Sequence, residues 1–427
     1  MRESGDEWGR RVGDELAGAN EEWQPLVDGS PAPASFGAPS AAPRPRLWGR
    51  DFTLLLAVNV LLYTAFQMLT PTLPLYVLSL GGGTAAAGLM IGLFTGAAVL
   101  IRPFAGWALD AYGRRLLLLL GLAAFLLASA AYGWFATVAL LIVLRPLHGL
   151  GFGVFTVSSG ALGADLTPKE RLGEGMGLIG VTWSLSMATG PPLGLAIVHR
   201  YGFEPLFPVA AAITAGALVL ALFLHYPRLT HTRHPFSFAG MFDRAALFPA
   251  TVTLLLTTSY GLLIAFVTVY AKQRGIPNMG LFFAVYAVVL TGSRMFIGRA
   301  SDRFGFWTVT LAGFVLVTAS LIELSLARTM AGFLMAGVLY ALGFGATQPS
   351  LLALVVTTLP ASRRGAANAV FLNAWDIGIT LGSIGGGILA AYLSFSRLYL
   401  LAVIPQLVAI ALLLARRRSA RRTQAAA

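Results

Sequence analysis

The sequence predicts an all-α membrane protein in which twelve transmembrane helices form two parallel six-helix repeats. Composition indicates a membrane, because 57% of the 427 residues are hydrophobic and only 11% are charged. A soluble chain of this length needs more polar surface. Many apolar runs reach about 20 residues, the length of a membrane-crossing helix. The alternation over about ten residues that marks a β-barrel strand is absent.

The expected spans follow one another along the chain. In the first half we expect helices at 53–77, 86–109, 116–135, 138–162, 174–198 and 204–226. In the second half we expect them at 247–271, 279–299, 308–327, 332–356, 367–391 and 396–415. The resulting parts are a polar tail (1–47), a first bundle (48–226), a linker (227–246), a second bundle (247–415) and a basic tail (416–427). The first tail lacks the apolar core of a signal peptide, so we expect it to be disordered.

The distribution of positive charge predicts the orientation. The formal net charge is +12, and 22 of the 30 Lys and Arg residues fall in tails and loops on one side of the predicted membrane. The loops on the other side hold Arg200, Lys272, Arg274, Arg328 and Arg397. This bias places both termini in the cytoplasm and the C-terminal arginines at anionic headgroups. We therefore expect a multi-pass protein of a bacterial plasma membrane, functional as a monomer, with no nucleic-acid partner.

Chemistry that depends on cysteine is excluded. The chain has no cysteine, so it forms no disulfide and no thiolate metal site. No HExxH or phosphate-binding loop pattern occurs, so we expect no metal and no cofactor.

A constant offset of 192 residues relates the two halves. Over some 90 residues, without a gap, it pairs Arg102 with Arg294, Gly106 with Gly298, Asp110 with Asp302, Gly113 with Gly305, Gly190 with Gly382 and Gly194 with Gly386. A fixed shift of this length indicates a duplicated six-helix unit. Two parallel units that each cross the membrane an even number of times are typical of secondary transporters.

One passage carries a resemblance to a known family. The pattern Gly106–x3–Asp110–x2–Gly113–Arg114–Arg115 resembles the signature between helices 2 and 3 of the major facilitator superfamily. Its second copy has Arg303 where the first has Ala111. The resemblance covers all of the chain except the N-terminal tail. It implies the major facilitator fold, with Asp110 docked at the start of the eleventh helix to latch the cytoplasmic side.

The same reasoning predicts a cytoplasmic gate. By the repeat, Asp302 should meet the start of the fifth helix. The glycines of the two copies should allow backbones to approach closely. The alternative is that both acids are solvated loop residues. The predicted gate residues are Asp110, Gly106, Gly113, Arg114, Arg115 and Arg102 in the first copy, and Asp302, Arg303, Gly298, Gly305 and Arg294 in the second.

Two further patterns resemble those of particular branches of the superfamily. Arg145 and His148 on helix 4 resemble a pattern of proton-coupled members, with His148 where glutamine is commoner. On helix 5, Gly177, Gly190, Pro191 and Gly194 resemble the pattern of drug:proton antiporters with twelve helices. Ser186 and Leu195 replace two of its usual glycines. Helix packing alone is the other interpretation of this stretch.

Charges found in one half only are candidates for proton coupling. The offset maps Arg145 to Gly337, Asp376 to Ser184 and Glu323 to Ala131. Ionisable residues inside a bilayer are costly and usually face a cavity or a partner. We expect Asp376 to carry the proton and Arg145 to act as its counterweight, with Glu323 and His148 as further candidates. The alternatives are a permanent ion pair for Asp376, a pair with Arg328 for Glu323 and a structural hydrogen bond for His148.

Polar and aromatic side chains on otherwise apolar helices predict the substrate cavity, with interhelical hydrogen bonding as the alternative. The candidates are Asn59, Tyr63, Gln67, Trp183, Thr251, Ser259, Tyr340, Gln348 and Asn373. Few charges and many aromatic rings favour an amphipathic or cationic small molecule. The leading hypothesis is proton-coupled efflux. The alternatives are a proton-coupled importer of a sugar or carboxylate and, less favoured, a polytopic membrane enzyme. An importer of organic anions should have more cavity arginines than Arg145 alone.

Overall fold

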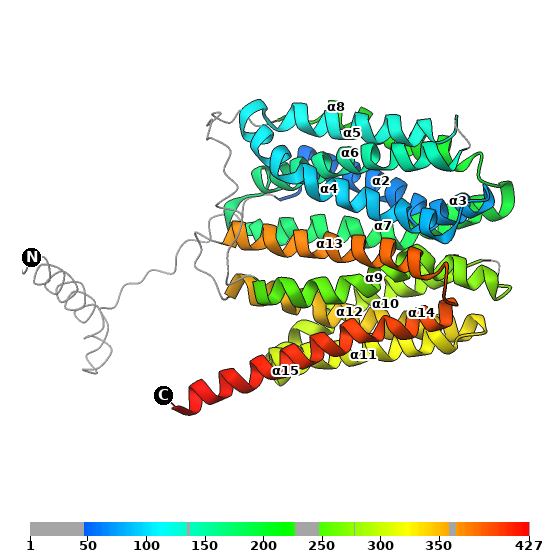
Figure 1. Ribbon diagram of the computed structural model, residues 1–427. Helices are drawn as coiled ribbons and strands as arrows, with labels where there is room; N and C mark the ends of the chain where they lie inside the picture. The colour runs from blue at the N-terminus through cyan, green and yellow to red at the C-terminus, as the bar shows by residue number, and fades with distance from the viewer. Residues whose placement is uncertain (1–46, 135–136, 227–246, 277, 358–363, 427) are drawn as a thin grey trace, which may run out of the picture. The chain divides into compact units, whose positions relative to one another are not determined.

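The computed structural model describes residues 47–134, 137–226, 247–276, 278–357 and 364–426. The predicted N-terminal tail, apart from Leu47, and the predicted linker 227–246 lie outside these residues. Within the described ranges all regular structure is helical, which confirms the all-α class (Figure 1).

Each predicted span corresponds to one helix or to a broken pair of helices. The first half contains α2 (Arg50–Leu69), α3 (Thr72–Ser79), α4 (Thr84–Tyr112), α5 (Arg114–Ala131), α6 (Val138–Leu166), η2 (Lys169–Arg171), α7 (Leu172–Tyr201) and α8 (Leu206–Leu222). The second half contains α9 (Leu247–Gln273), α10 (Gly280–Phe304), α11 (Phe306–Leu326), α12 (Met330–Thr357), α13 (Arg364–Leu389), α14 (Phe395–Leu401) and α15 (Val403–Ala426). Among the described residues, nine helical segments are long and apolar enough to cross a membrane, and Leu206–Leu222 and Gly280–Arg294 are shorter apolar helices.

The first span is broken where the sequence predicts one continuous helix. Pro71 has no backbone N–H, so α2 ends at Leu69 and α3 begins at Thr72. Thr70 Oγ1 donates to the Phe66 carbonyl at 2.9 Å, and Thr72 Oγ1 donates to the Met68 carbonyl at 2.8 Å. These side chains satisfy backbone acceptors at the break, as apolar surroundings require.

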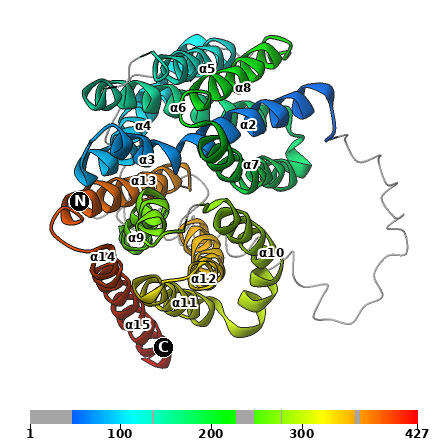
Figure 2. The same ribbon diagram turned by 90° about the vertical axis from the view of Figure 1, so that its right-hand side faces the viewer.

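Glycine contacts hold each half together in the same way. Gly121 of α5 lies against α6, where an added Cβ would stand 2.6 Å from the Phe155 nitrogen. Its offset counterpart, Gly313 of α11, lies against α12, where a Cβ would stand 2.8 Å from the Gly343 carbonyl oxygen. Only glycine allows backbones to approach this closely. The repeat read from the sequence is therefore a repeat of packing, and Figure 2 shows the helices of the two halves as two groups.

The two halves meet mainly where α4 packs on α13 and where α7 packs on α10. Thr84 Oγ1, at the start of α4, donates to the Gly387 carbonyl at 3.0 Å. Thr268 Oγ1 of α9 donates to the Pro71 carbonyl at 3.2 Å. We call the end of the bundle with these contacts the packed end. The other end, where α2 begins at Arg50 and α15 extends beyond Arg416, is the arginine-rich end.

Candidate functional site

A cavity of about 160 Å³ lies between the halves. One water needs only about 10–15 Å³ on this scale, so the space suits a small molecule. Helices α2, α4, α6 and α7 of the first half and α9 and α13 of the second supply its wall. The lining residues are Phe66, Gln67, Thr70, Ile91, Phe94, Thr95, Ala98, Arg102, Arg145, Phe152, Thr156, Trp183, Tyr260, Ile264, Leu372, Trp375, Asp376 and Ile379.

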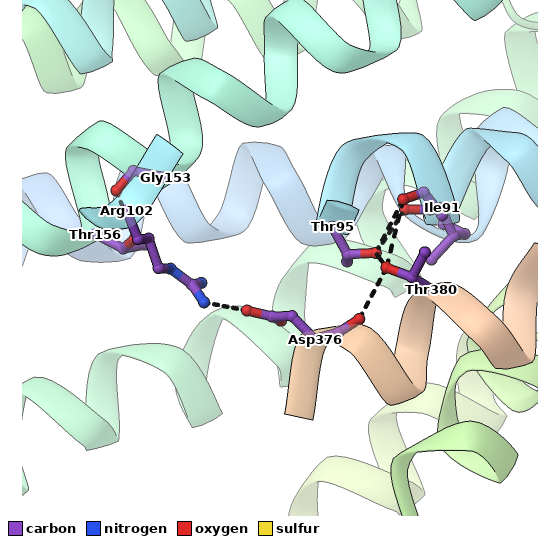
Figure 3. A network of polar contacts seen from close by, with 8 residues as sticks. Ile91, Thr95, Arg102, Gly153, Thr156, Asp376 and Thr380 are labelled. Carbon is purple, nitrogen blue, oxygen red and sulfur yellow. Dashed lines mark hydrogen bonds and ion pairs between the residues drawn. The ribbon is translucent and has the colours of Figure 1, made fainter. Parts of the chain in front are cut away.

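An ion pair joins the halves at the cavity wall. Arg102 of α4 donates from Nη1 to Asp376 Oδ2 of α13 (Figure 3). The Asp376 side chain is 12% exposed and that of Arg102 is 20% exposed. Because α4 packs along α13, the arginine reaches the carboxylate without crossing the cavity. The charges of both residues are thereby compensated in a low-dielectric setting, where an unpaired charge would be costly.

Hydroxyl groups continue this contact along the two helices. Thr380 Oγ1 donates to the Asp376 carbonyl at 2.8 Å and lies 2.7 Å from Thr95 Oγ1 of α4 (Figure 3). Thr95 Oγ1 also lies 3.1 Å from the Ile91 carbonyl, which accepts its proton. The ion pair is therefore part of a polar seam between α4 and α13 within an otherwise apolar interface.

Arg145 of α6 is fully buried and does not pair with Asp376. Its Nε donates to the Met90 carbonyl of α4, and its guanidinium carbon lies 4.4 Å from the centre of the Phe94 ring. Its Nη2 has no hydrogen-bond partner among the described atoms. The role of Arg145 as counterweight to Asp376 stays a prediction, and in this conformation the carboxylate is paired with Arg102 instead. The reason is that α6 packs on α4 and α5, so that the side chain meets the α4 backbone first.

His148 is a hydrogen-bond partner of Arg145. Arg145 Nη1 lies 3.2 Å from His148 Nδ1, and a guanidinium can only donate, so Nδ1 is the acceptor and the ring proton belongs on Nε2. His148 Nε2 lies 3.4 Å from Ser129 Oγ, and Tyr132 Oη lies 3.1 Å from Nδ1. His148 is fully buried and is not among the residues that line the cavity. Its contacts fit the alternative of a structural hydrogen-bonding residue.

Aromatic rings form most of the remaining wall. The Phe66 ring stacks on Phe94 and Phe152 at centroid distances of 5.0 and 4.7 Å, and it lies 5.7 Å from Trp183. Across the cavity, Tyr260 of α9 and Trp375 of α13 face it from the second half. These flat surfaces suit a planar or apolar molecular body.

Two of the nine predicted cavity residues, Gln67 and Trp183, line the cavity. Tyr63 stands behind the wall, with its ring 5.1 Å from that of Trp183. Asn59 accepts a hydrogen bond from Ser159 at 2.7 Å, which joins α2 to α6. The others lie elsewhere.

Those other residues make contacts within the second half. Ser259 and Tyr340 share a hydrogen bond of 2.8 Å between α9 and α12. Thr251 donates to its own helix, and Gln348 accepts from Arg294 at 3.1 Å. Asn373 is half-buried on α13. For most of these polar residues, the alternative of hydrogen bonding within the bundle is what the structure contains.

The predicted gate residues lie at or near the arginine-rich end. Arg114 contacts Asp110 at 3.3 Å and Asp165 of α6 at 3.0 Å. Gly113 and Gly305 have φ values of 88° and 79°, a backbone that favours glycine, where α4 and α10 end. An added Cβ at Gly106 would meet no atom within 4 Å, so the expected close approach is not made there.

The remaining gate residues either contact a nearby aromatic ring or have side chains outside the part of the chain that the structure describes. Arg115 lies over the Tyr226 ring at 5.9 Å, and Arg303 lies over the Phe304 ring at 5.3 Å. The surroundings of Gly298 and Asp302 lie outside the described side chains. So does the start of α13, which is the predicted partner of Asp110. The latch itself stays a prediction.

The glycines predicted on the fifth span, which is α7, lie in two different surroundings. Gly190 and Gly194 of α7 pack on α2, where an added Cβ at Gly190 would stand 2.8 Å from the Thr64 carbonyl oxygen. Pro191 is buried, and the next residue, Pro192, lies against Gly280 of α10. Gly177 has no neighbour within 4 Å of an added Cβ. Most of this stretch therefore serves packing on α2, beside the α10 interface.

Glu323 is half-buried one turn before the end of α11 and is not among the cavity-lining residues. The alternative for Glu323, an ion pair with Arg328, is not among the ion pairs of the described residues. In the same part of the chain, no group of three or more His, Asp or Glu side chains is placed to hold a metal ion.

Two six-helix halves around a central cavity, joined by an ion pair, match the architecture expected of a transporter. The sequence model of the Major Facilitator Superfamily matches residues 55–383. The chain belongs to the Major Facilitator Superfamily. Among its relatives, the MFS-type transporter YhhS of Escherichia coli (strain K12) is 26% identical over 394 residues, which cover 88% of this chain and 95% of YhhS. The MFS-type transporter MJ1560 of Methanocaldococcus jannaschii is 22% identical over 371 residues, which cover 83% of this chain and 92% of MJ1560.

Solved structures share the facilitator fold at low sequence identity. The nucleoside transporter NupG superposes with a TM-score of 0.74 at 14% identity, over 85% of this chain and 99% of NupG. The human organic anion transporter MFSD10 superposes with a TM-score of 0.64 at 18% identity, over 85% of this chain and 99% of MFSD10. The protein is thus a multi-pass secondary transporter of the Major Facilitator Superfamily.

Sequence reasoning missed several of the residues that line the cavity. Trp375 is the offset counterpart of Trp183, so the repeat itself could have identified it. The repeat predicts Arg102 as a gate residue like its counterpart Arg294, yet among the described residues Arg102 pairs with an acid whereas Arg294 bonds to Gln348. Phe66 and Phe94 carry no signal that separates them from other apolar residues of their helices.

Proposed function

We propose that this superfamily member is a proton-coupled transporter that exposes its central cavity alternately to the two sides of a plasma membrane. The positive-inside bias supports placing the arginine-rich end in the cytoplasm. The observation that carries the proposal is the Arg102–Asp376 pair, which joins the two halves at the wall of the cavity.

The pair offers a direct route from proton binding to movement. Protonation of Asp376 would remove its charge and weaken its bond to Arg102. The contact between α4 and α13 would then lose its strongest polar interaction, so the halves could separate at that point. A substrate in the same cavity would bias the same equilibrium, which is the requirement for coupled transport.

We propose export as the direction, with a small amphipathic molecule as substrate. The resemblance of α7 to the exporter pattern supports export, although Gly190 and Gly194 pack within one half. A cation is disfavoured, since two arginines and one carboxylate line the cavity and give it a net positive charge. Of the two expected classes of substrate, amphipathic or cationic, we therefore propose the amphipathic one.

Import of a small carboxylate by proton symport is the second candidate. We expected an importer of organic anions to have more than one cavity arginine, and Arg102 adds a second to Arg145. The fold shared with the human organic anion transporter MFSD10 agrees with this possibility, as a likeness of fold alone.

The test uses purified protein in liposomes with an imposed pH gradient. Wild-type protein should drive uphill movement of at least one compound from a panel of amphipathic acids, amines and neutral molecules. Asp376→Asn should still exchange that compound down its gradient but lose proton-driven accumulation. Glu204→Gln, an exposed acid in a loop, is the matched control and should behave as wild type.

The same experiment decides direction. Accumulation driven by a gradient oriented for antiport supports export, and accumulation by symport supports import. Uphill movement by Asp376→Asn at the wild-type rate would remove this residue as the proton carrier.

A further inference from the structure

Two donor groups of residues that line the cavity lack acceptors. Gln67 is 5% exposed and Arg145 is fully buried, and both line the cavity. Gln67 Nε2 and Arg145 Nη2 have no hydrogen-bond partner among the described atoms. A buried donor without an acceptor is destabilising, and more so when the group is charged. Two such donors among the residues that line one cavity indicate a place for a ligand with acceptor atoms.

The charge at this place is also uncompensated. Arg145 has a carbonyl, a histidine nitrogen and the face of Phe94 around it, and none of these carries a full negative charge. The carboxylate in the cavity wall, Asp376, is already bonded to Arg102. The other lining residues are neutral, so the cavity carries one excess positive charge while that pair is intact. A ligand with one negative charge would balance it.

The donors and the ion pair lie at different depths. Counted at 1.5 Å per residue from the arginine-rich ends of their helices, Arg102 and Asp376 lie about 15–18 Å deep. Gln67 and Arg145 lie about 25–32 Å deep on the same count. Phe66, Phe94, Phe152 and the two tryptophans line the same cavity. A molecule with an anionic head and a flat apolar body fits this arrangement.

We propose that Gln67 and Arg145 form the binding site for the carboxylate of a small organic anion whose apolar body lies among these aromatic rings. This inference rests on the proposed transport function, because it concerns the same cavity, but it does not depend on direction. Arg145 supplies a charge-assisted hydrogen bond, and Gln67 supplies a neutral one. In this role Arg145 binds substrate, whereas the Arg102–Asp376 pair responds to protons.

Binding can be measured without transport, because Trp183 and Trp375 line the cavity and should report on an occupant by their fluorescence. Purified full-length protein in nanodiscs is titrated with benzoate, benzamide and benzylammonium, which share one ring and differ in charge. Benzoate should bind at least about tenfold more tightly than the other two, the equivalent of about 1.4 kcal/mol. Equal binding of all three, or tighter binding of benzylammonium, would overturn the inference.

Variants locate the site. Arg145→Gln and Gln67→Leu should each weaken benzoate binding by about tenfold, as expected for the loss of one hydrogen bond to a charged group. Gln67→Glu should weaken it further by repulsion, while its melting temperature without ligand shows whether it is folded. Arg200→Gln, at an exposed arginine near the packed end, is the matched control and should bind as wild type.

Because Arg145 also holds the α4 backbone, the Gln67 variants keep the test decisive if Arg145→Gln does not fold. Unchanged benzoate affinity in folded Gln67→Leu and Gln67→Glu would contradict the site. Chloride that competes with benzoate at equal concentration would show a general anion site and would contradict the organic substrate. The proposed transport function would survive either result, since it fails only if no compound moves in response to a pH gradient.

Discussion

The two halves share their glycine contacts and differ in their buried charges. In the first half, Arg145 of α6 bonds to Met90 of α4. In the second half, the offset counterpart of Arg145 is Gly337, and Phe282 takes the place of Met90. The Phe282 ring lies over Gly337, where an added Cβ would stand 2.8 Å from it. An aromatic ring thus fills the space that a guanidinium fills in the other half.

The same contrast holds where the halves meet. Arg102 of α4 meets Asp376 of α13, whereas its counterpart Arg294 of α10 donates to Gln348 within its own half. The acid has the counterpart Ser184 on α7, so the second interface lacks the carboxylate. Repeated glycines therefore maintain the fold, whereas the charges at the cavity come from Arg145 and Asp376, which are not repeated, and from Arg102, whose counterpart Arg294 bonds to an amide. Variants at matched positions of the two halves test this division.

The largest effect should come from the shared glycines. A Cβ at Gly382 would collide with the Thr258 carbonyl of α9, as a Cβ at Gly190 would with that of Thr64 of α2. We expect Gly190→Val and Gly382→Val each to cost about 3 kcal/mol, because no flexible side chain can yield. The yield of monodisperse protein and its melting temperature measure this.

Gly385→Val is the matched control, since an added Cβ there meets nothing within 4 Å. If only one of the two repeated positions proved sensitive, the halves would not share the same packing.

The next largest effect should be a difference in transport between variants of the arginines at the two interfaces. Arg102→Ala leaves the Asp376 carboxylate without its partner, so we expect loss of proton-driven flux by about tenfold or more and a lower melting temperature. Arg294→Ala loses one bond to an amide and should keep most of the flux. The double variant Arg102→Ala/Asp376→Asn should melt higher than Arg102→Ala, because the unpaired charge is gone. Equal losses in both arginine variants would break the comparison.

A smaller effect is expected at the predicted gate. Asp110→Asn should weaken closure of the arginine-rich end, and Asp302→Asn should act more mildly because Arg303 is an added charged neighbour. Single cysteines placed in the cavity report accessibility against a background with no native cysteine. We expect labelling to rise several-fold in Asp110→Asn. Labelling that stays at the wild-type rate in both variants would remove the gate assignment.

The smallest effect concerns Tyr226, which follows α8 at the arginine-rich end. Burial raises the pKa of Tyr226 to about 12, against the opposing effect of Arg115. An unfolded tyrosine ionises near pH 10, so the folded state holds the proton more tightly between about pH 10 and pH 12. Stability should therefore fall as the pH rises through this window.

Tyr226→Phe removes that titration and should flatten the fall in melting temperature above pH 10. It also removes the hydrogen bond to the Ala221 carbonyl, 2.7 Å long, and should cost about 1 kcal/mol at neutral pH. A fall of the same steepness in the variant would assign the pH effect to other groups.

The sequence by itself predicted twelve spans and a duplication, and it indicated the family that the comparison then showed. Apolar runs of membrane length can only form helices there, because backbone groups in lipid need internal partners. The offset of 192 residues indicated a duplicated unit, and Gly121 and Gly313, which it relates, make corresponding contacts in the two halves. The search for charges found in one half only selected Asp376 and Arg145, which line the cavity, and Glu323, which does not.

Only the tertiary structure decided which charges meet. Arg102 and Asp376 are 274 residues apart, and no periodicity within one helix relates them. Their contact depends on α4 packing along α13, just as the isolation of Arg145 depends on α6 packing against α4 and α5. Likewise, a polar side chain such as Asn59 faces either a cavity or a neighbouring helix according to small rotations of its helix. Such rotations are set by the side chains of the partner helices, which lie far away in the sequence.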